Sequence, residues 1–323
     1  MTLDQLKYAL ELRKALHFSN AARNCHISQP SLSLQIAKLE EELDLQLFVR
    51  TRTGVEITQA GEVLLRQARL ILDESERLVQ MSQELKGRIQ GPFRLGIIPT
   101  LAPTLLPHFA GEFQKGHPDV ELMILEERTE RLVRDIENGD LDAALMSTPL
   151  KAPEMLLEKT LGYEPFVLLF SQGHPLLQKK KISVDQISAD EILLLDETHC
   201  LRDQVLQLCK KQNSQVGSRH LRLQSASLQT LIEFIRSSEG YTLLPALAMS
   251  FLTPSEKTQV IRHFERPLPT RKISLVFNRS RLKRAVIEAL FETLQSHLPA
   301  AILPVKARQD IRVLSPDLDH FEI

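Results

Sequence analysis

Residues 58–88 constrain the fold of this chain most, because they contain no proline and repeat apolar or small residues at helical spacing. We predict one long helix with a seam long enough for an interface between two helices. The seam consists of Val63, Leu64, Ala68, Ile71, Leu72, Ser75, Leu78, Val79, Ser82 and Leu85. Packing on its own domain is the alternative, but residues 1–57 make a domain too small to cover this seam. The segment KGRIQGP, residues 86–92, then combines glycine, proline and charge as linkers do.

Beyond this linker, strand-like and helical segments alternate. FRLGII, VELMILEE and LDAALMS have the character of strands, and TLLPHFAGEFQKG and ERLVRDIENG between them have helical character. This alternation predicts an α/β fold with right-handed βαβ units and a parallel sheet. A second run, from PFVLLF to YTLLPALAM, repeats the pattern and predicts a second α/β lobe.

The composition is that of a soluble globular protein of about two domains. Hydrophobic residues make up 43% and charged residues 25% of 323, and the net charge is −1, which favours no particular partner. No apolar run is long enough to span a membrane, and the segment MTLDQLKYAL does not resemble a secretory signal. Three widely spaced cysteines form no disulfide framework, so we expect a cytoplasmic protein without membrane contact.

The segment HFSNAARNCHISQPSLSLQIAKLEEELDLQLFVR predicts two short helices joined by a tight turn. Ser28 is a good N-cap, and Pro30 falls in the first turn of the second helix. One face of that helix is an apolar stripe of Leu32, Ile36, Leu39 and Leu43. The other face presents Pro30, Ser31, Ser33, Leu34 and Lys38. Small side chains there would let the helix enter a major groove, although an ordinary helical hairpin with a solvated face would show the same spacing.

This segment, followed by ITQAG, resembles the winged helix-turn-helix of LysR-type transcriptional regulators. The shared residues are the Ala-Ala pair, SQPSLS, the Ile and Leu-Glu of IAKLE, the LF and Arg of LFVR, and the Thr and Ala-Gly of TQAG. The resemblance implies binding to double-stranded promoter DNA. Ser31, Ser33 and Leu34 would face the groove, with Gln29 and Lys38 nearer the backbone and Arg50 and Arg52 at the wing. Gly54 stands where many relatives carry a basic residue.

The same resemblance implies the architecture of the whole chain. Residues 1–58 would be the winged helix-turn-helix domain and residues 59–88 the dimerisation helix. Residues 89–300 would be a two-lobed regulatory domain similar to periplasmic binding proteins, with lobe I at about 92–163 and 268–300 and lobe II at about 164–267. Residues 301–323 form a tail that no pattern explains. Such regulators usually pair as dimers into homotetramers, and RNA polymerase is an expected partner.

The segment DETHCLRDQVLQLCKK, residues 196–211, contains Cys200 and Cys209. Leu201, Val205 and Leu208 are helically spaced, and a helix would place the cysteine Cα atoms about 13 Å apart. A disulfide needs Cα atoms within about 7 Å, so bonding would require the helix to unravel. From the residues alone, two buried unreactive thiols are the favoured interpretation. A zinc site is less favoured, because four ligands at normal spacing are absent.

A closer resemblance changes that interpretation. HCLRDQ with a cysteine beyond it, GIIPT, SLQTL and TLLPALA are similar to the peroxide-sensing branch of the LysR family, and the similarity extends to about Leu298. It implies that Cys200 is peroxidatic, reacting with hydrogen peroxide, and that Cys209 resolves the sulfenic acid as a disulfide. The remaining pocket residues implied are Thr100, Thr129, His199, Asp203 and Arg271. Glutaredoxin or thioredoxin would return the cysteines to thiols.

Two other functions stay open at this point. A LysR-type regulator could instead bind a small organic anion between its lobes and carry incidental cysteines. A thiol peroxidase could use the same cysteine pair, but the DNA-binding half argues against an enzyme. We therefore expect a redox-responsive regulator without catalytic residues, metal site or cofactor, which controls antioxidant genes.

Overall fold

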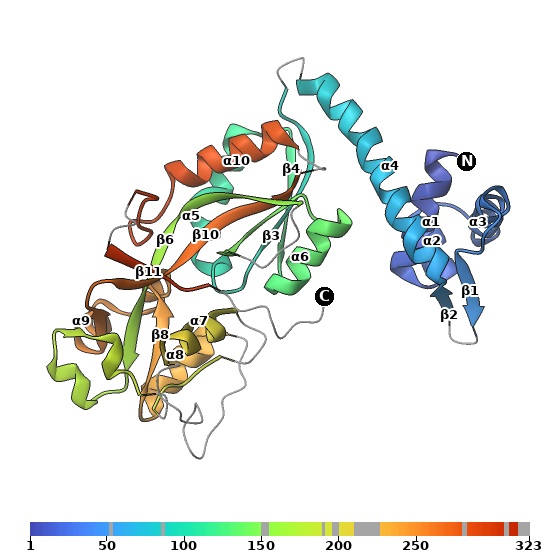
Figure 1. The fold of residues 1–323 in the computed structure, drawn as a ribbon. Helices are drawn as coiled ribbons and strands as arrows, with labels where there is room; N and C mark the ends of the chain where they lie inside the picture. Colours follow the sequence, from blue (N-terminus) through green and yellow to red (C-terminus); the bar gives the residue numbers. More distant parts are fainter. Residues whose placement is uncertain are drawn as a thin grey trace. The chain divides into compact units, whose positions relative to one another are not determined.

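The computed structural model describes residues 1–51, 54–84, 88–149, 155–188, 191–195, 200–209, 227–279, 283–306 and 310–315. The chain divides into two compact units, Met1–Arg88 and Ile89–Ile323, and each is described by itself (Figure 1). None of the helices in the described ranges has the length and hydropathy that crossing a membrane requires.

The first unit combines helices with a small two-stranded hairpin. Its helices are α1 (Leu3–Ala15), α2 (Phe18–Asn24), α3 (Gln29–Leu43) and α4 (Gln59–Glu84). The antiparallel hairpin joins β1 (Phe48–Thr51) to β2 (Gly54–Ile57). This arrangement is a helix-turn-helix followed by a wing, as the sequence predicts.

Helix α3 begins as its sequence predicts. The Ser28 hydroxyl accepts the Ser31 amide at 3.2 Å, and a proline occupies the first turn, where an amide would have no helical partner. The helix ends at Asp44, whose left-handed φ of 50° closes it. The predicted inward stripe is confirmed, since Leu32, Ile36 and Leu39 are buried.

Helix α4 corrects the prediction of one continuous free seam. Ala68 and Leu72 belong to the core of the first unit, together with Leu65. Helix α1 packs against α4 and covers this side of it, so the small domain does cover part of the helix. Large apolar side chains remain exposed at Val63, Leu70, Ile71, Leu78, Val79 and Met81. Within the described part of α4, a helix–helix interface would use these exposed residues, and Leu85 of the predicted seam lies outside the described residues.

The second unit is built on a mixed β-sheet whose strands run in the order β4-β3-β5-β10-β6-β9-β7. The strands are β3 (Gly91–Ile97), β4 (Val120–Glu126), β5 (Ala143–Thr148), β6 (Leu156–Phe170), β7 (Lys181–Ile182), β8 (Tyr241–Pro245), β9 (Ile261–Phe264), β10 (Leu268–Asn278) and β11 (Ile311–Val313). Strands β3, β4 and β5 are parallel, but β10 runs antiparallel to both β5 and β6. The expectation of a parallel sheet is correct for β3, β4 and β5 and for the pairs β7–β9 and β10–β11, whereas the antiparallel strands β6 and β10 make the whole sheet mixed.

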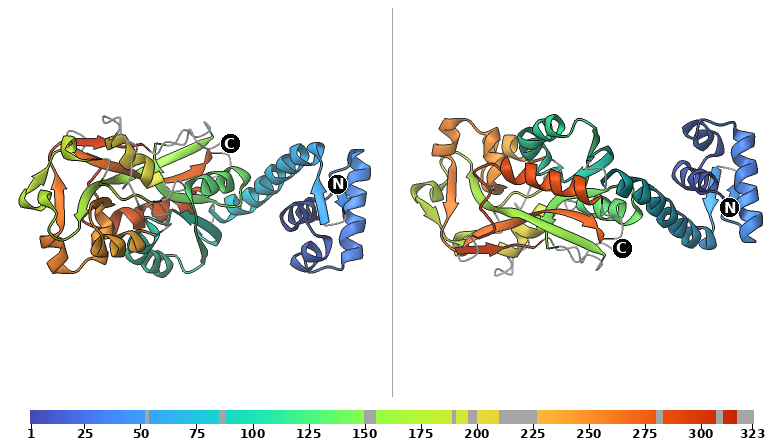
Figure 2. Two further views of the ribbon diagram at one scale, coloured as in Figure 1. Left: turned by 90° about the horizontal axis from the view of Figure 1, so that it is seen from below. Right: turned by 90° about the horizontal axis from the view of Figure 1, so that it is seen from above.

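Two separate hydrophobic cores give this unit two lobes. The first core includes α5 (Ala102–Gly116), α6 (Thr129–Asn138) and α10 (Arg284–Ser296), and the second includes α7 (Cys200–Cys209) and α8 (Leu228–Ser237). The long strand β6 contributes Leu161 to the first core and Phe166 to the second. Strands β6 and β10 thus pass between the lobes, as the two views in Figure 2 show.

The chain after α10 is part of the fold. Leu303 exchanges two backbone hydrogen bonds with Tyr163, at 2.7 and 2.9 Å. A Cβ atom at Gly162 would lie 2.5 Å from the Leu303 carbonyl oxygen, so this close approach requires glycine. Further on, β11 pairs in parallel with the start of β10, and Leu314 is buried in the second core.

Candidate functional site

The outer face of α3 presents most of the predicted DNA-contacting residues to solvent. Gln29, Pro30, Ser31, Leu34 and Lys38 are exposed, and Leu34 retains 55% of its accessible surface. An exposed leucine between small polar residues is suited to contact with base edges and thymine methyl groups.

Ser33 and Arg50 connect α3 to the wing. The Arg50 Nη2 atom donates to the Ser33 hydroxyl at 2.6 Å, and its guanidinium stacks 4.4 Å from the ring centroid of Phe18. Ser33 is half-buried and already accepts this hydrogen bond, so its contact with DNA would be shared with Arg50. Arg52 lies outside the described residues.

In the second unit, polar residues gather at the carboxyl ends of the three parallel strands. Thr100 follows β3, Thr129 begins α6 after β4, and Ser147 lies at the end of β5. These three side chains are buried, with at most 3% of their surface exposed. Carboxyl ends of parallel strands are the usual ligand-binding edge of an α/β sheet.

A buried ion pair between Arg271 and Glu164 lies beside Thr100. The two residues face each other across β10 and β6, and both side chains are fully buried. The Arg271 Nε atom donates to Glu164 Oε2 at 2.9 Å, and Nη1 donates to the Thr100 hydroxyl at 2.7 Å. The other oxygen of Glu164 accepts the Leu247 amide at 2.8 Å. The structure therefore brings Thr100 and Arg271 together directly, whereas Thr129 makes no hydrogen bond to either of them in the described residues.

This pair determines the local charge beside Thr100. The Arg271 charge is compensated by Glu164, so the two residues together are neutral. Nη1 carries two N–H groups, and Thr100 takes one of them. No described residue accepts the second, which leaves a hydrogen-bond donor in a buried, neutral environment.

Helix α7 packs next to these residues. Leu201, Val205 and Leu208 are buried, which confirms the predicted apolar stripe. Between them, the fully buried Gln204 donates from Nε2 to the Ser147 hydroxyl and to the Leu314 carbonyl, both at 2.9 Å. Its Oε1 atom has no hydrogen-bond partner among the described residues.

Strand register relates α7 to the ion pair. Ser147 lies opposite Ile273 on β10, and Arg271 is two residues from Ile273. Because side chains alternate along a strand, Arg271 and Ile273 point to the same face of the sheet as Ser147. Gln204, and hence α7, therefore approaches the face of the sheet that carries the ion pair.

The two cysteines are the first and last residues of α7. The rise of a helix places their Cα atoms about 13 Å apart. Their side chains and His199 lie outside the described residues, and Asp203 is half-buried within α7. The helical form of this segment is as predicted, while the roles of its residues remain predictions.

Two residues of the site, Glu164 and Gln204, are not among those predicted from the sequence. Glu164 is the one charged residue in the second half of β6, residues 161–170, and this isolation was a signal that it pairs with another buried charge. Gln204 lies within the apolar stripe of α7, four residues after Cys200, where a polar residue needs a partner.

The third cysteine, Cys25, is a free, half-buried thiol in the turn before α3. Partial burial and the nearby Glu11 carboxylate both raise its pKa, which disfavours a reactive thiolate. Among the described residues, no cluster of histidine, cysteine and carboxylate side chains could hold a metal ion.

Comparison with known families places this chain in a class of bacterial regulators. Residues 3–62 match the bacterial regulatory helix-turn-helix protein, lysR family, and residues 86–299 match the LysR substrate binding domain. The chain belongs to the LysR family of DNA-binding transcriptional regulators, and it is not an enzyme.

Within this family, the chain is similar to peroxide-responsive members. The hydrogen peroxide-inducible genes activator of Dickeya chrysanthemi is 34% identical over 301 residues, covering 92% of this chain and 96% of that protein. A cysteine-to-aspartate variant of full-length OxyR from Pseudomonas aeruginosa matches with a TM-score of 0.77 and 31% identity, covering 94% of this chain and 99% of its own. A peroxide-bound cysteine-to-serine variant of OxyR from Corynebacterium glutamicum has a TM-score of 0.61 and 31% identity, covering 93% and 95%.

Proposed function

We propose that this protein senses hydrogen peroxide through Cys200 and regulates antioxidant genes through its helix-turn-helix domain. The buried Arg271–Glu164 pair beside Thr100 carries this proposal. It offers a hydrogen-bond donor without a net positive charge, which suits a small neutral ligand such as hydrogen peroxide. The relatives named for peroxide response support the same assignment.

The chemistry would proceed in two steps. The Cys200 thiolate attacks one oxygen of hydrogen peroxide, forming an S–O bond while the O–O bond breaks, and the leaving hydroxide takes a proton to become water. The Cys209 thiolate then attacks the sulfenic sulfur, so an S–S bond forms and the second hydroxide leaves as water. Two electrons pass from the two thiols to the peroxide.

Arg271, Gln204 and Thr100 would position the peroxide. The second N–H of Arg271 Nη1 would donate to a peroxide oxygen, and the unpartnered Oε1 of Gln204 would accept a peroxide O–H. Thr100 holds the arginine in place from the other side. Thr129, His199 and Asp203 would complete the pocket, as the family resemblance implies.

A regulator that binds a small organic anion is the alternative function. An anion entering this pocket would meet the Glu164 carboxylate as well as Arg271, and like charges in a buried site repel strongly. An uncharged oxidant avoids that repulsion. We therefore favour the peroxide sensor.

The assembly and partners belong to the same proposal. Residues 1–58 would bind promoter DNA, residues 59–88 would form the dimer, and residues 89–300 would sense peroxide. The exposed apolar residues of α4 would carry the dimer contact, and dimers would pair into tetramers. We propose further that the protein works in the cytoplasm, contacts RNA polymerase, and is reduced by glutaredoxin or thioredoxin.

A non-reducing peptide map after brief peroxide exposure tests the chemistry. We expect a disulfide between Cys200 and Cys209 in the wild type and none in Cys200→Ser. The Cys209→Ser variant should stop at a sulfenic acid, which dimedone labels on Cys200. Cys25→Ser is the matched control and should respond like the wild type. If no disulfide between Cys200 and Cys209 forms at low peroxide, the proposed function is wrong.

A further inference from the structure

Residues 310–315, the last ones that the structure describes, lie against α7, the helix that carries both cysteines. Strand β11 and Leu314 reach α7 from the side of β10. We propose that residues 310–315, here called the C-terminal latch, hold α7 in its helical form and thereby limit how fast the disulfide closes. This inference rests on the proposed peroxide function.

The latch is anchored to the strands that join the lobes. Leu268, Pro269 and Thr270 of β10 pair in register with Ile311, Arg312 and Val313. The Leu314 amide continues the pairing by donating to the Thr270 carbonyl at 2.8 Å. Because Thr270 directly precedes Arg271, the latch is fixed next to the ion pair of the pocket.

Two side chains of α7 donate hydrogen bonds to the backbone of the latch. Gln204 donates to the Leu314 carbonyl at 2.9 Å, and Gln207 donates to the Ser315 carbonyl at 2.5 Å. The Leu314 side chain, with 1% of its surface exposed, lies in the same core as Leu201, Val205 and Leu208. The latch therefore contacts the helix through two hydrogen bonds and one buried apolar side chain.

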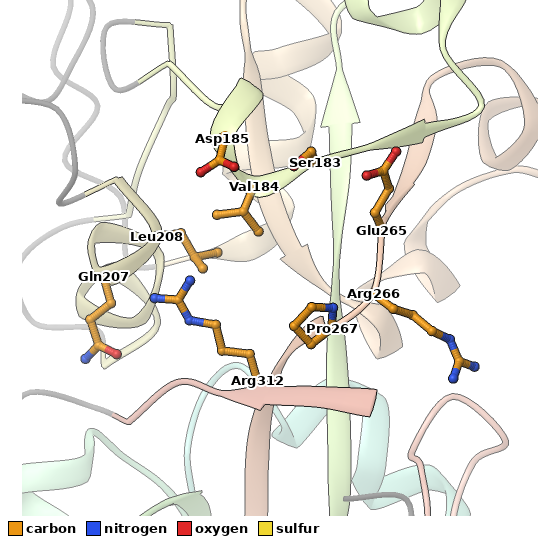
Figure 3. Close-up of a pocket in the computed structure, with 9 residues that line it drawn as sticks. All are labelled: Ser183, Val184, Asp185, Gln207, Leu208, Glu265, Arg266, Pro267 and Arg312. Carbon is orange, nitrogen blue, oxygen red and sulfur yellow. The ribbon is translucent and has the colours of Figure 1, made fainter. Parts of the chain in front are cut away.

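A cavity borders the last turn of α7 and one residue of the latch. A cavity of about 250 Å³ is lined by Gln207 and Leu208, by Ser183, Val184 and Asp185, and by Pro267 and Arg312 (Figure 3). In this view Arg312 extends from β11 toward the end of α7. Because this turn borders a cavity, it is retained by the contacts of the latch and by burial of Leu208 in the second core.

Disulfide closure must break these contacts. The cysteine Cα atoms would approach from about 13 Å to about 6 Å, which a continuous helix between them cannot accommodate. Unwinding between Cys200 and Cys209 moves Gln204 and Gln207 away from the carbonyl groups that they bond. Release of the latch is therefore coupled to closure, whereas the first attack on peroxide by Cys200 does not require it.

The test compares Leu314→Ala with Val313→Ala in the full-length protein. Val313 is the adjacent residue of the same segment, but 39% of its surface is exposed, so its truncation leaves the buried contact intact. Hydrogen exchange of the reduced proteins reports opening of residues 200–209. Truncating a buried leucine should accelerate exchange there at least about tenfold in Leu314→Ala, with little change in the control. Gln207→Leu, which removes only a hydrogen bond, should have a smaller effect in the same direction.

A quenched peroxide time course then separates the two chemical steps. In Leu314→Ala, closure of the disulfide should be faster than in Val313→Ala, while dimedone labelling of Cys200 in a Cys209→Ser background should proceed at an unchanged rate. If hydrogen exchange across residues 200–209 were unchanged in Leu314→Ala, the proposal that the latch holds α7 would be wrong. Exchange accelerated equally throughout the second core would also contradict it. A wild type that forms no disulfide would refute the proposed function instead, and the exchange result would still decide whether the latch holds α7.

Discussion

Replacing Glu164 by glutamine tests how the buried pair shapes the pocket. The substitution keeps the size of the side chain and an oxygen that can accept the Leu247 amide, but it removes the charge that compensates Arg271. Both side chains are fully buried, so the arginine would be left charged without solvent or counterion. Removing one partner of such a pair costs about 3–5 kcal/mol of folding free energy.

Urea unfolding followed by far-UV circular dichroism measures this loss, since the chain contains no tryptophan for fluorescence. With a slope of about 3 kcal/mol per molar urea, the midpoint should fall by about 1–1.7 M. Glu158→Gln is the matched control, because Glu158 pairs with Lys272 across the same two strands but is partly exposed. An exposed pair of this kind contributes no more than about 1 kcal/mol.

The same substitution should change reactivity in the opposite direction. An uncompensated Arg271 charge near the pocket would favour the thiolate form of Cys200, so the thiol should react faster with peroxide at neutral pH. Loss of stability together with gain of reactivity is the signature that we expect. A midpoint equal to that of Glu158→Gln, or a slower reaction with peroxide, would refute the assignment of Glu164 as the charge that neutralises the pocket.

The remaining predictions concern DNA, assembly and acid stability. Ser31→Ala should weaken specific DNA binding by about 1–3 kcal/mol for a lost base contact in a filter-binding or anisotropy assay, and leave non-specific binding unchanged. Leu78→Asp should split the proposed dimer in sedimentation while the first unit stays folded, whereas Leu72→Asp should unfold that unit because Leu72 lies in its core. The Arg236 hydrogen bond holds the Glu256 pKa at about 2, below its ordinary 4.5, so its contribution to stability is present above pH 4.5 and is lost as the pH falls toward 2. Glu256→Gln should remove this loss from an acid titration of unfolding, and an unchanged acid profile would contradict it.

Local structure was predictable where neighbouring residues determine it. The Ser28 cap and Pro30 fix the start of α3, and helical spacing of apolar residues fixes both α3 and α7. The peptide groups of such segments find their partners within a few residues, so the signal is contained in the segment itself.

Long-range pairing was not predictable from these patterns. Arg271 and Glu164 are 107 residues apart, and nothing in either segment specifies the antiparallel register that brings them together. Gln204 and the Leu314 carbonyl are 110 residues apart. The error about α4 has the same origin, because periodicity shows that a face is apolar but not which element covers it.

The contacts of α7 would also determine which form of the proposed switch is stable without oxidant. Unwinding the helix removes Leu201, Val205 and Leu208 from the core, and burial of each such side chain contributes about 1.5–3 kcal/mol. The proposed disulfide form would lose most of this energy, so the helical form would be recovered once a thiol reductant opened the bond. A disulfide that opposes native packing is easier to reduce than a structural one. In the proposed mechanism, the packing that resists closure would therefore also reset the sensor.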